Sequence, residues 1–102
     1  MRDRLELHEE LCGLLGSRNV YFQPSTNTSI KYPGIVYKLS KVDSKFADNK
    51  RYTKMGVYTI THMYREYKNR LLDEFLDHFA FIDLADKFDN DGLHHDVYKL
   101  YF

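Results

Sequence analysis

The sequence is poor in cysteine, proline and glycine, and it has no tryptophan among its 102 residues. A single cysteine, Cys12, excludes an intrachain disulfide and a zinc site of the Cys-x-x-Cys type, and it favours a reducing, cytosolic compartment. The five glycines are scattered, so the chain has no glycine-rich phosphate-binding loop. It also has no Gly-x-Ser-x-Gly nucleophile motif. These absences argue against several large classes of enzyme.

Long apolar runs and an excess of charge of either sign are also missing. No stretch approaches the roughly 20 apolar residues that cross a bilayer. Residues 1–6 (MRDRLE) are charged where a secretory signal would be apolar. Lys plus Arg equals Asp plus Glu at 15 each, so the formal net charge is zero. With no strong overall field and little self-repulsion, we expect a soluble protein that can pack against copies of itself.

Aromatic residues, in contrast, are abundant. Nine tyrosines and seven phenylalanines make up 16% of the chain. Both residue types supply large apolar area, and Tyr loses little conformational freedom when it is buried in a contact. A chain of this length predicts one domain, 1–102, with a small interior. We expect that interior to hold only part of the aromatic area and the remainder to serve subunit contacts.

The hydrophobic periodicity predicts two helices and five strands. Helices are expected over 3–15, ended by Gly16, and over 70–79, capped by Asn69. Strands are expected over 20–22, 34–42, 51–64, 81–88 and 97–102. The charged segment 43–50 is predicted as a loop, and 89–92 as a hairpin turn because of its Asp-Gly pair. The fold class is α+β, a single domain with a mainly antiparallel sheet of four to five strands flanked by two helices, in the order α-β-β-β-α-β-β.

The predicted strand 51–64 divides its side chains between two faces of a sheet. One face carries Tyr58, Ile60, His62 and Tyr64, and the other carries Val57, Thr59, Thr61 and Met63. Neither face is wholly polar. This is the pattern expected when one face covers the core and the other meets a neighbouring subunit.

Two clusters contain residues used in metal binding. The first is His94-His95-Asp96. Adjacent side chains of a strand point to opposite faces, so only His94 and Asp96 could share an ion. A third ligand would have to come from elsewhere, such as Asp91 or His62, and nothing in the sequence fixes it. The segment 89–92 (DNDG) fails as a calcium loop, because Lys87 and Tyr98 would stand where acidic ligands are required. We expect no metal and no cofactor.

Other reactive side chains also have simple structural interpretations. Cys12 has no fixed histidine partner and lies among helix leucines, so we expect a buried, unreactive thiol. His8 and His78 lie among acidic neighbours and are expected at the surface. We therefore predict no catalytic residue and no enzymatic activity.

Basic and aromatic residues surround the predicted loop 43–50. The basic ones are Lys38, Lys41, Lys45, Lys50, Arg51 and Lys54, interleaved with Tyr37, Phe46 and Tyr52. Such a set can stack on bases and contact phosphates. Asp43 and Asp48 dilute the charge, however, and no RNA-recognition signature is present. A loop that reaches a neighbouring subunit is the favoured interpretation, and a small nucleic-acid-binding domain is an alternative.

Several strings of residues carry a likeness to a known family. They are 15–24 (LGSRNVYFQP), 32–37 (YPGIVY), 46–49 (FADN), 58–61 (YTIT) and 93–102 (LHHDVYKLYF). In these strings, and in the order of its segments, nearly the whole chain resembles the small neck and tail-completion proteins of tailed bacteriophages. It departs from them at 64–68 (YREYK), where a turn richer in Pro, Asp and Ser is expected, and this leaves the orientation of the second helix open.

The resemblance implies a tail terminator or head-to-tail joining subunit, a structural virion protein assembled in the host cytoplasm. Such subunits form rings, commonly six-fold, that cap the tail tube and contact both the tail tube protein and a head-closure or connector protein. The genome DNA passes through the ring without specific binding, and no membrane is involved. A head-completion or connector-adaptor protein of the same neck region is the alternative within this class.

Surplus aromatic residues define the predicted subunit interface. It comprises Phe46, Tyr52, Tyr58, Tyr64, Tyr98, Tyr101 and Phe102. Phe46 has no evident core neighbour in the sequence, so it either contacts a partner or folds back onto its own sheet. If it contacts a partner, Phe46→Ala impairs assembly far more than folding, as sedimentation and thermal melting would measure.

Overall fold

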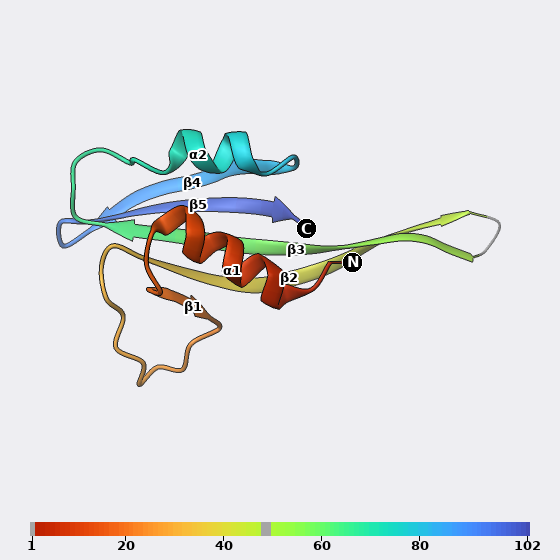
Figure 1. The fold of residues 1–102 in the computed structure, drawn as a ribbon, viewed down its shortest axis with the longest axis horizontal. Helices are drawn as coiled ribbons and strands as arrows, with labels where there is room; N and C mark the ends of the chain where they lie inside the picture. The colour runs from red at the N-terminus through yellow and green to blue at the C-terminus, as the bar shows by residue number, and fades with distance from the viewer. Residues whose placement is uncertain (1, 48–49) are drawn as a thin grey trace.

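Two helices lie on one face of a five-stranded sheet in the computed structural model (Figure 1). The structure describes residues 2–47 and 50–102, with side chains described over 2–44 and 54–102. The elements are α1 (Arg4–Leu15), β1 (Val20–Phe22), β2 (Gly34–Ala47), β3 (Lys50–Tyr64), α2 (Leu72–His78), β4 (Ile82–Asn90) and β5 (Leu93–Tyr101). Their order confirms the predicted α+β class.

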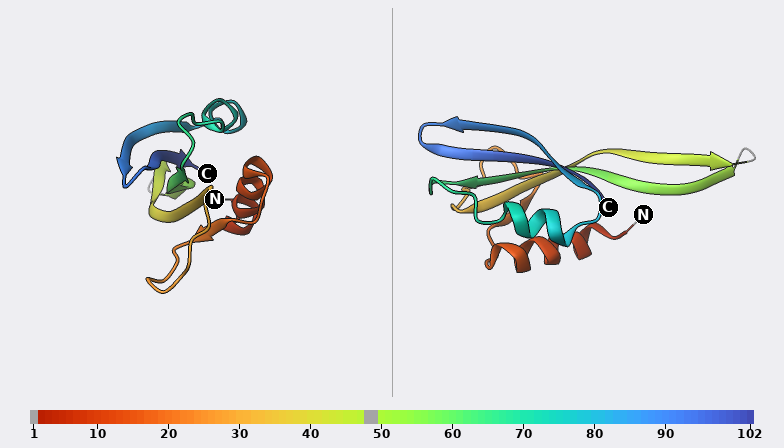
Figure 2. Two further views of the ribbon diagram at one scale, coloured as in Figure 1. Left: turned by 90° about the vertical axis from the view of Figure 1, so that its left-hand side faces the viewer. Right: turned by 90° about the horizontal axis from the view of Figure 1, so that it is seen from above.

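The strand order across the sheet is β1-β2-β3-β5-β4. β1 pairs with β2 in parallel, and all other pairs are antiparallel. An end-on view places α1 and α2 on the same side of the sheet (Figure 2). The domain therefore has two layers, with β4 forming one edge of the sheet.

Local signals in the sequence account for the ends of α1. The Asp3 side chain accepts a hydrogen bond from the Leu5 N–H at 3.1 Å, which satisfies one of the free donors of the first turn. Gly16 ends the helix with a positive φ of 81°, a conformation that glycine adopts without steric cost. Leu7 and Leu11 are fully buried against the sheet.

The core lies between the helices and one sheet face, and it is rich in tyrosine. The predicted division of β3 is confirmed, since Tyr58 and Ile60 pack in this core. Tyr37 and Tyr98 are also fully buried there. The Tyr37 hydroxyl bonds with His8 Nδ1 at 2.7 Å, so His8 is half-buried rather than at the surface as predicted.

The largest departure from the predicted elements concerns 43–50. This charged segment was expected to be a loop, but β2 continues to Ala47 and β3 begins at Lys50. Charge does not oppose strand formation here, because residues 43–47 pair with 50–55 in a two-stranded hairpin beyond the body. The Asp91-Gly92 turn confirms the predicted hairpin, with φ of 53° and 75°. β5 accordingly starts at Leu93, four residues earlier than expected.

Candidate assembly surfaces

The β2–β3 hairpin projects from the body as an arm, defined here as residues 41–56 (Figure 1). β3 joins β5 only from Val57 onward, so the seven residues 50–56 have β2 as their partner strand, and Gly56 also accepts a hydrogen bond from the Phe102 N–H. At about 3.3 Å per residue they extend about 23 Å beyond the rest of the sheet. The arm explains the elongated shape, whose principal extents are 51 × 29 × 23 Å.

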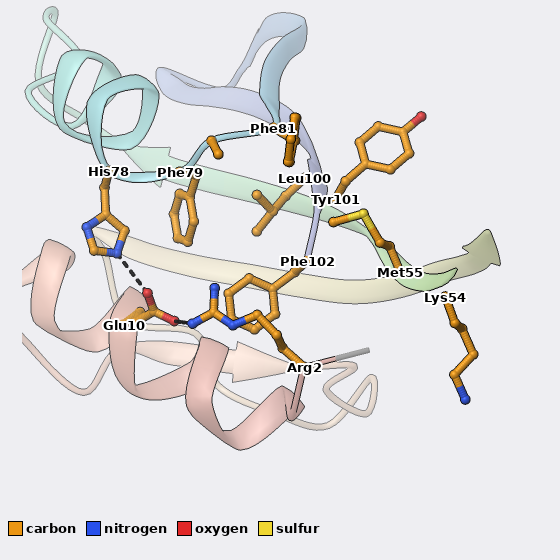
Figure 3. Close-up of a pocket in the computed structure, with 11 residues that line it drawn as sticks. Arg2, Glu10, Lys54, Met55, His78, Phe79, Phe81, Leu100, Tyr101 and Phe102 are labelled. Atoms are coloured by element: carbon orange, nitrogen blue, oxygen red, sulfur yellow. Dashed lines mark hydrogen bonds and ion pairs between the residues drawn. The ribbon is translucent and has the colours of Figure 1, made fainter. Parts of the chain in front are cut away.

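A pocket of about 350 Å³ lies where the arm leaves the body. Its apolar floor includes Phe79, Phe102 and Leu100, and Met55 closes the side next to the arm (Figure 3). The Arg2 guanidinium lies over the Phe102 ring at 3.9 Å from its centroid. This geometry suits an apolar side chain of a partner with a polar neighbour.

Ion pairs organise the polar wall of this pocket. Arg2 contacts Glu10 at 3.2 Å and Glu6 at 2.5 Å. Glu10 also contacts His78 Nε2 at 2.9 Å, so one carboxylate joins the N-terminus to the end of α2 (Figure 3). The wall is tied together by residues from both helices, which positions it without requiring a ligand.

The outer edge of the sheet is acidic and unusually exposed. Every residue of β4 except Ile82 is exposed. Large apolar side chains lie among the acids, with Phe81 61%, Leu84 39% and Phe88 47% exposed. A register shift between Leu84 and Asp86 interrupts the regular pairing with β5. Bulges and charges of this kind discourage indiscriminate strand pairing at an edge.

A polar network centred on Asp96 is buried at the opposite end of the sheet from the arm. The Asp96 carboxylate is 1% exposed and accepts hydrogen bonds from the Tyr64 hydroxyl at 2.8 Å, from Lys87 Nζ at 2.9 Å and from Asn69 Nδ2. Burial acts to raise the pKa of Asp96, but these three bonds outweigh it and hold the pKa below its usual value. The same carboxylate bond to Lys87 raises the pKa of that amine. The network joins β3, β4, β5 and the loop before α2.

Asn69 has a different role from the predicted helix cap. Its Oδ1 accepts a hydrogen bond from the Leu71 N–H at 2.8 Å, while its Nδ2 donates to Asp96 and to the Tyr98 hydroxyl. The helix itself starts at Leu72, two residues later than expected. Burial raises the pKa of Tyr98 to about 12, so its hydroxyl stays protonated. Asn69 thus anchors the 65–71 loop onto the sheet.

His62 lies beside this network with an unsatisfied nitrogen. The side chain is 3% exposed, and within the described part of the chain its Nδ1 has no hydrogen-bond partner. Its ring stacks on Tyr64 at 4.8 Å between centroids and meets the edge of Phe75. Burial lowers the pKa of His62 to about 4, although Asp96 opposes that shift. His62 is therefore neutral near pH 7.

The possible metal ligands are not brought together. Among residues 2–47 and 50–102, no three His, Cys, Asp or Glu side chains are placed to hold an ion. His94 pairs with Asp89, whereas His95 stacks on Phe88 on the other face, as alternation predicts. Cys12 is buried as expected, and burial raises the pKa of its thiol.

The predicted interface residues are largely used inside the subunit. Tyr58, Tyr64 and Tyr98 are buried in the subunit, and Phe102 is buried except where it contributes to the pocket floor. Tyr101 is half-buried at the edge of the pocket. The side chains of Phe46 and Tyr52 lie outside the described residues.

The accessible aromatic surface lies elsewhere. Among the side chains that the structure describes, the exposed aromatic ones are Tyr32, Tyr67, Phe81 and Phe88. Two of these, Phe81 and Phe88, flank or lie in β4, where an acid occurs every two or three residues. That spacing was the signal for an exposed strand, because acids at Asp83, Asp86 and Asp89 leave neither face of β4 suited to a core.

No protein-family model, curated protein or solved structure matches this chain. In the part of the chain that the structure describes, neither helix has the length and apolar character needed to cross a membrane. The class of protein must be inferred from the arm, the pocket and the acidic edge themselves.

Proposed function

We propose that the chain is a structural virion protein of a bacteriophage neck, which assembles into a ring that terminates the tail tube and joins tail to head. The observation that carries the proposal is the arm. A hairpin that extends about 23 Å beyond the rest of the sheet is longer than its attachment to the body requires, and contact with another molecule accounts for that length.

Three further features support an assembly role. The likeness to tail-completion proteins, in strings of residues and in the order of segments, extends over nearly the whole chain. A pocket with an apolar floor lies at the root of the arm, and apolar side chains are exposed along β4. A subunit with an arm at one end and separate contact surfaces on its body suits the head-to-tail contacts that close a ring. In this role the protein binds no cofactor and catalyses no reaction.

Disruption of the gene in the phage tests the proposal. Particles without the protein are expected to have free heads and detached tail tubes of irregular length, because nothing caps the tube or joins it to the head. Wild-type protein supplied in trans restores joined particles. Normal joined particles in its absence would contradict the proposal.

Microscopy of labelled particles separates the proposal from its nearest alternative. A tail terminator is expected at the top of the tail tube with the six-fold symmetry of the tube. A head-completion or connector-adaptor protein is expected one layer higher, with the symmetry of the connector. Label on the capsid or at the tail tip would contradict both.

A further inference from the structure

Charge is strongly segregated along this electrically neutral chain. The arm, residues 41–56, contains five basic and two acidic residues, a net charge of +3. The segment 72–91, which comprises α2, β4 and the residue after it, contains seven acidic residues and one lysine, a net charge of −6. Two surfaces of opposite sign attract each other when they belong to different copies.

The acidic segment presents these charges to solvent. Asp83 and Asp86 are exposed, and their cross-strand neighbours place both on the face of the sheet that lacks helices in the described structure. The one lysine, Lys87, is exposed, but its amine is bonded to Asp96. Lys99 on β5 lies opposite Asp83 and balances part of the charge, so the segment keeps an excess of acidic side chains.

The two surfaces also match in shape and polarity. β4 spans nine residues, and the strands of the arm span six or seven beyond the body, so their lengths are comparable. Exposed apolar side chains occur on both, Val42 on the arm and Leu84 and Phe88 on β4. Contact between them would remove apolar area from water as well as pair charges.

A subunit cannot make this contact with itself. The arm leaves the body at one end of the sheet, whereas β4 runs beside β5 toward the turn at the other end (Figures 1 and 2). Contact between the arm of one copy and the edge of the next uses two different surfaces. It therefore repeats head to tail and closes into a ring when the rotation permits.

We infer that the arm of each copy docks along the acidic edge formed by α2 and β4 of the next copy. This inference rests on the proposed self-assembly and names the surfaces that mediate it. The partner is a second copy of this chain, and the contact pairs basic arm side chains with Asp83 and Asp86.

Complementary charge reversal tests the inference. An arm variant, Lys41→Glu with Lys54→Glu, changes the net charge of the arm from +3 to −1. An edge variant, in which the four aspartates 73, 77, 83 and 86 are replaced by lysine, changes the net charge of 72–91 from −6 to +2, and all six side chains are exposed. Each variant alone places like charges at the contact, and we expect it to sediment as a monomer under conditions where the wild type assembles. An equimolar mixture is expected to regain assembly, because each arm then faces an edge of opposite sign.

The mixture has a distinctive signature. In the mixture, an arm and an edge of opposite charge meet only when the two variants alternate around the ring. Closed rings of the mixture therefore contain an even number of subunits and equal amounts of each variant. Native mass spectrometry measures both. Wild-type assembly should also weaken on the order of tenfold or more between low and high salt, because exposed charges are screened within about 10 Å at 0.1 M.

The matched control reverses two lysines away from both surfaces, Lys31→Glu with Lys68→Glu. It is expected to assemble as the wild type does. Thermal melting of every variant checks that its fold is retained. A disulfide between Val42→Cys and Leu84→Cys, in a Cys12→Ser background, provides a position-specific second test and is expected to link neighbouring copies.

Several results would overturn the inference. They are a mixture that stays monomeric, variants that assemble singly, no cross-link between positions 42 and 84, and a wild type that stays monomeric at millimolar concentration and low salt. Loss of DNA binding by the arm variant without loss of assembly would assign the arm to nucleic acid instead. If the charge-reversal experiment fails but the labelled protein is found at the neck, the inference is wrong and the proposed function stands. If the variants assemble as predicted but particles are normal after gene disruption, the proposed function is wrong and the inference stands.

Discussion

At the scale of single residues, Asp96 is the polar centre of the fold. Three donors from three parts of the chain converge on its buried carboxylate. Removing the acceptor would leave the Tyr64 hydroxyl and the Asn69 amide without this partner in a largely water-free site. Asp96 therefore stabilises the fold mainly by keeping these buried donors hydrogen-bonded, and not only through its ion pair with Lys87.

We therefore expect Asp96→Ala to lower the free energy of unfolding by about 3 kcal/mol. Urea denaturation at pH 7 measures the change. Asp83→Ala is a suitable control, because this exposed acid on β4 should change stability by no more than about 0.5 kcal/mol. Equal effects of the two substitutions would show that the network does not stabilise the fold.

His62 makes stability depend on pH in a defined window. Its pKa is about 4 in the folded state and about 6.5 when unfolded. The unfolded state thus binds the proton first as pH falls, so stability is lost from about pH 6.5 down to 4. Between pH 7 and pH 5 the loss from this residue is about 2 kcal/mol. The Asp96 contribution persists over that range, because a lowered carboxyl pKa acts only at more acidic pH.

The substitution His62→Phe isolates this effect from the other histidines. It keeps an aromatic ring against Tyr64 and Phe75 but removes the titrating nitrogen. Denaturation at pH 7 and pH 5 should show a smaller loss for the variant than for the wild type. Identical losses would mean that His62 is protonated with no penalty in the folded protein.

At the scale of elements, local patterns in the sequence were sufficient where each element packs against the core. The leucine spacing and Gly16 predicted α1, and alternation predicted which residues of β3 face the helices. The arm was not predicted, because its strands extend beyond the body. The alternation of apolar and polar residues therefore carried no information there, and the many charged residues were typical of a loop. The buried Asp96 network could not be predicted either, because it joins residues as many as 32 apart in the sequence.

Shortening the arm should separate folding from assembly. Replacement of 44–54 by Asn-Gly joins Asp43 to Met55, which are already opposite each other, through a tight turn. We expect the melting temperature to stay within a few degrees, since the core lies in the body. Sedimentation should show a monomer. A large loss of stability would instead place the arm among the elements that hold the subunit together.

At the scale of the whole molecule, zero net charge conceals a strong asymmetry. The basic arm and the acidic edge lie on different parts of an elongated body, so each copy carries complementary surfaces without a large overall charge. The aromatic residues are divided as well: seven of the described ones are buried, and the four exposed ones include Phe81 and Phe88 at the acidic edge. We therefore expect the proposed subunit contacts to use the aromatic side chains that the core does not bury.

Hydrogen exchange should map this division directly. In dilute solution the amides of β3 and β5 that pair in the body are expected to exchange slowly. Those of the arm and the outer amides of β4 are expected to exchange fast, because the arm has two strands only and β4 is an edge strand. At concentrations that permit assembly, protection should rise in the arm and in β4 together and remain unchanged in α1. Protection of the arm alone would indicate that it docks on a surface other than β4, and unchanged exchange in both segments would show that neither belongs to the subunit contact.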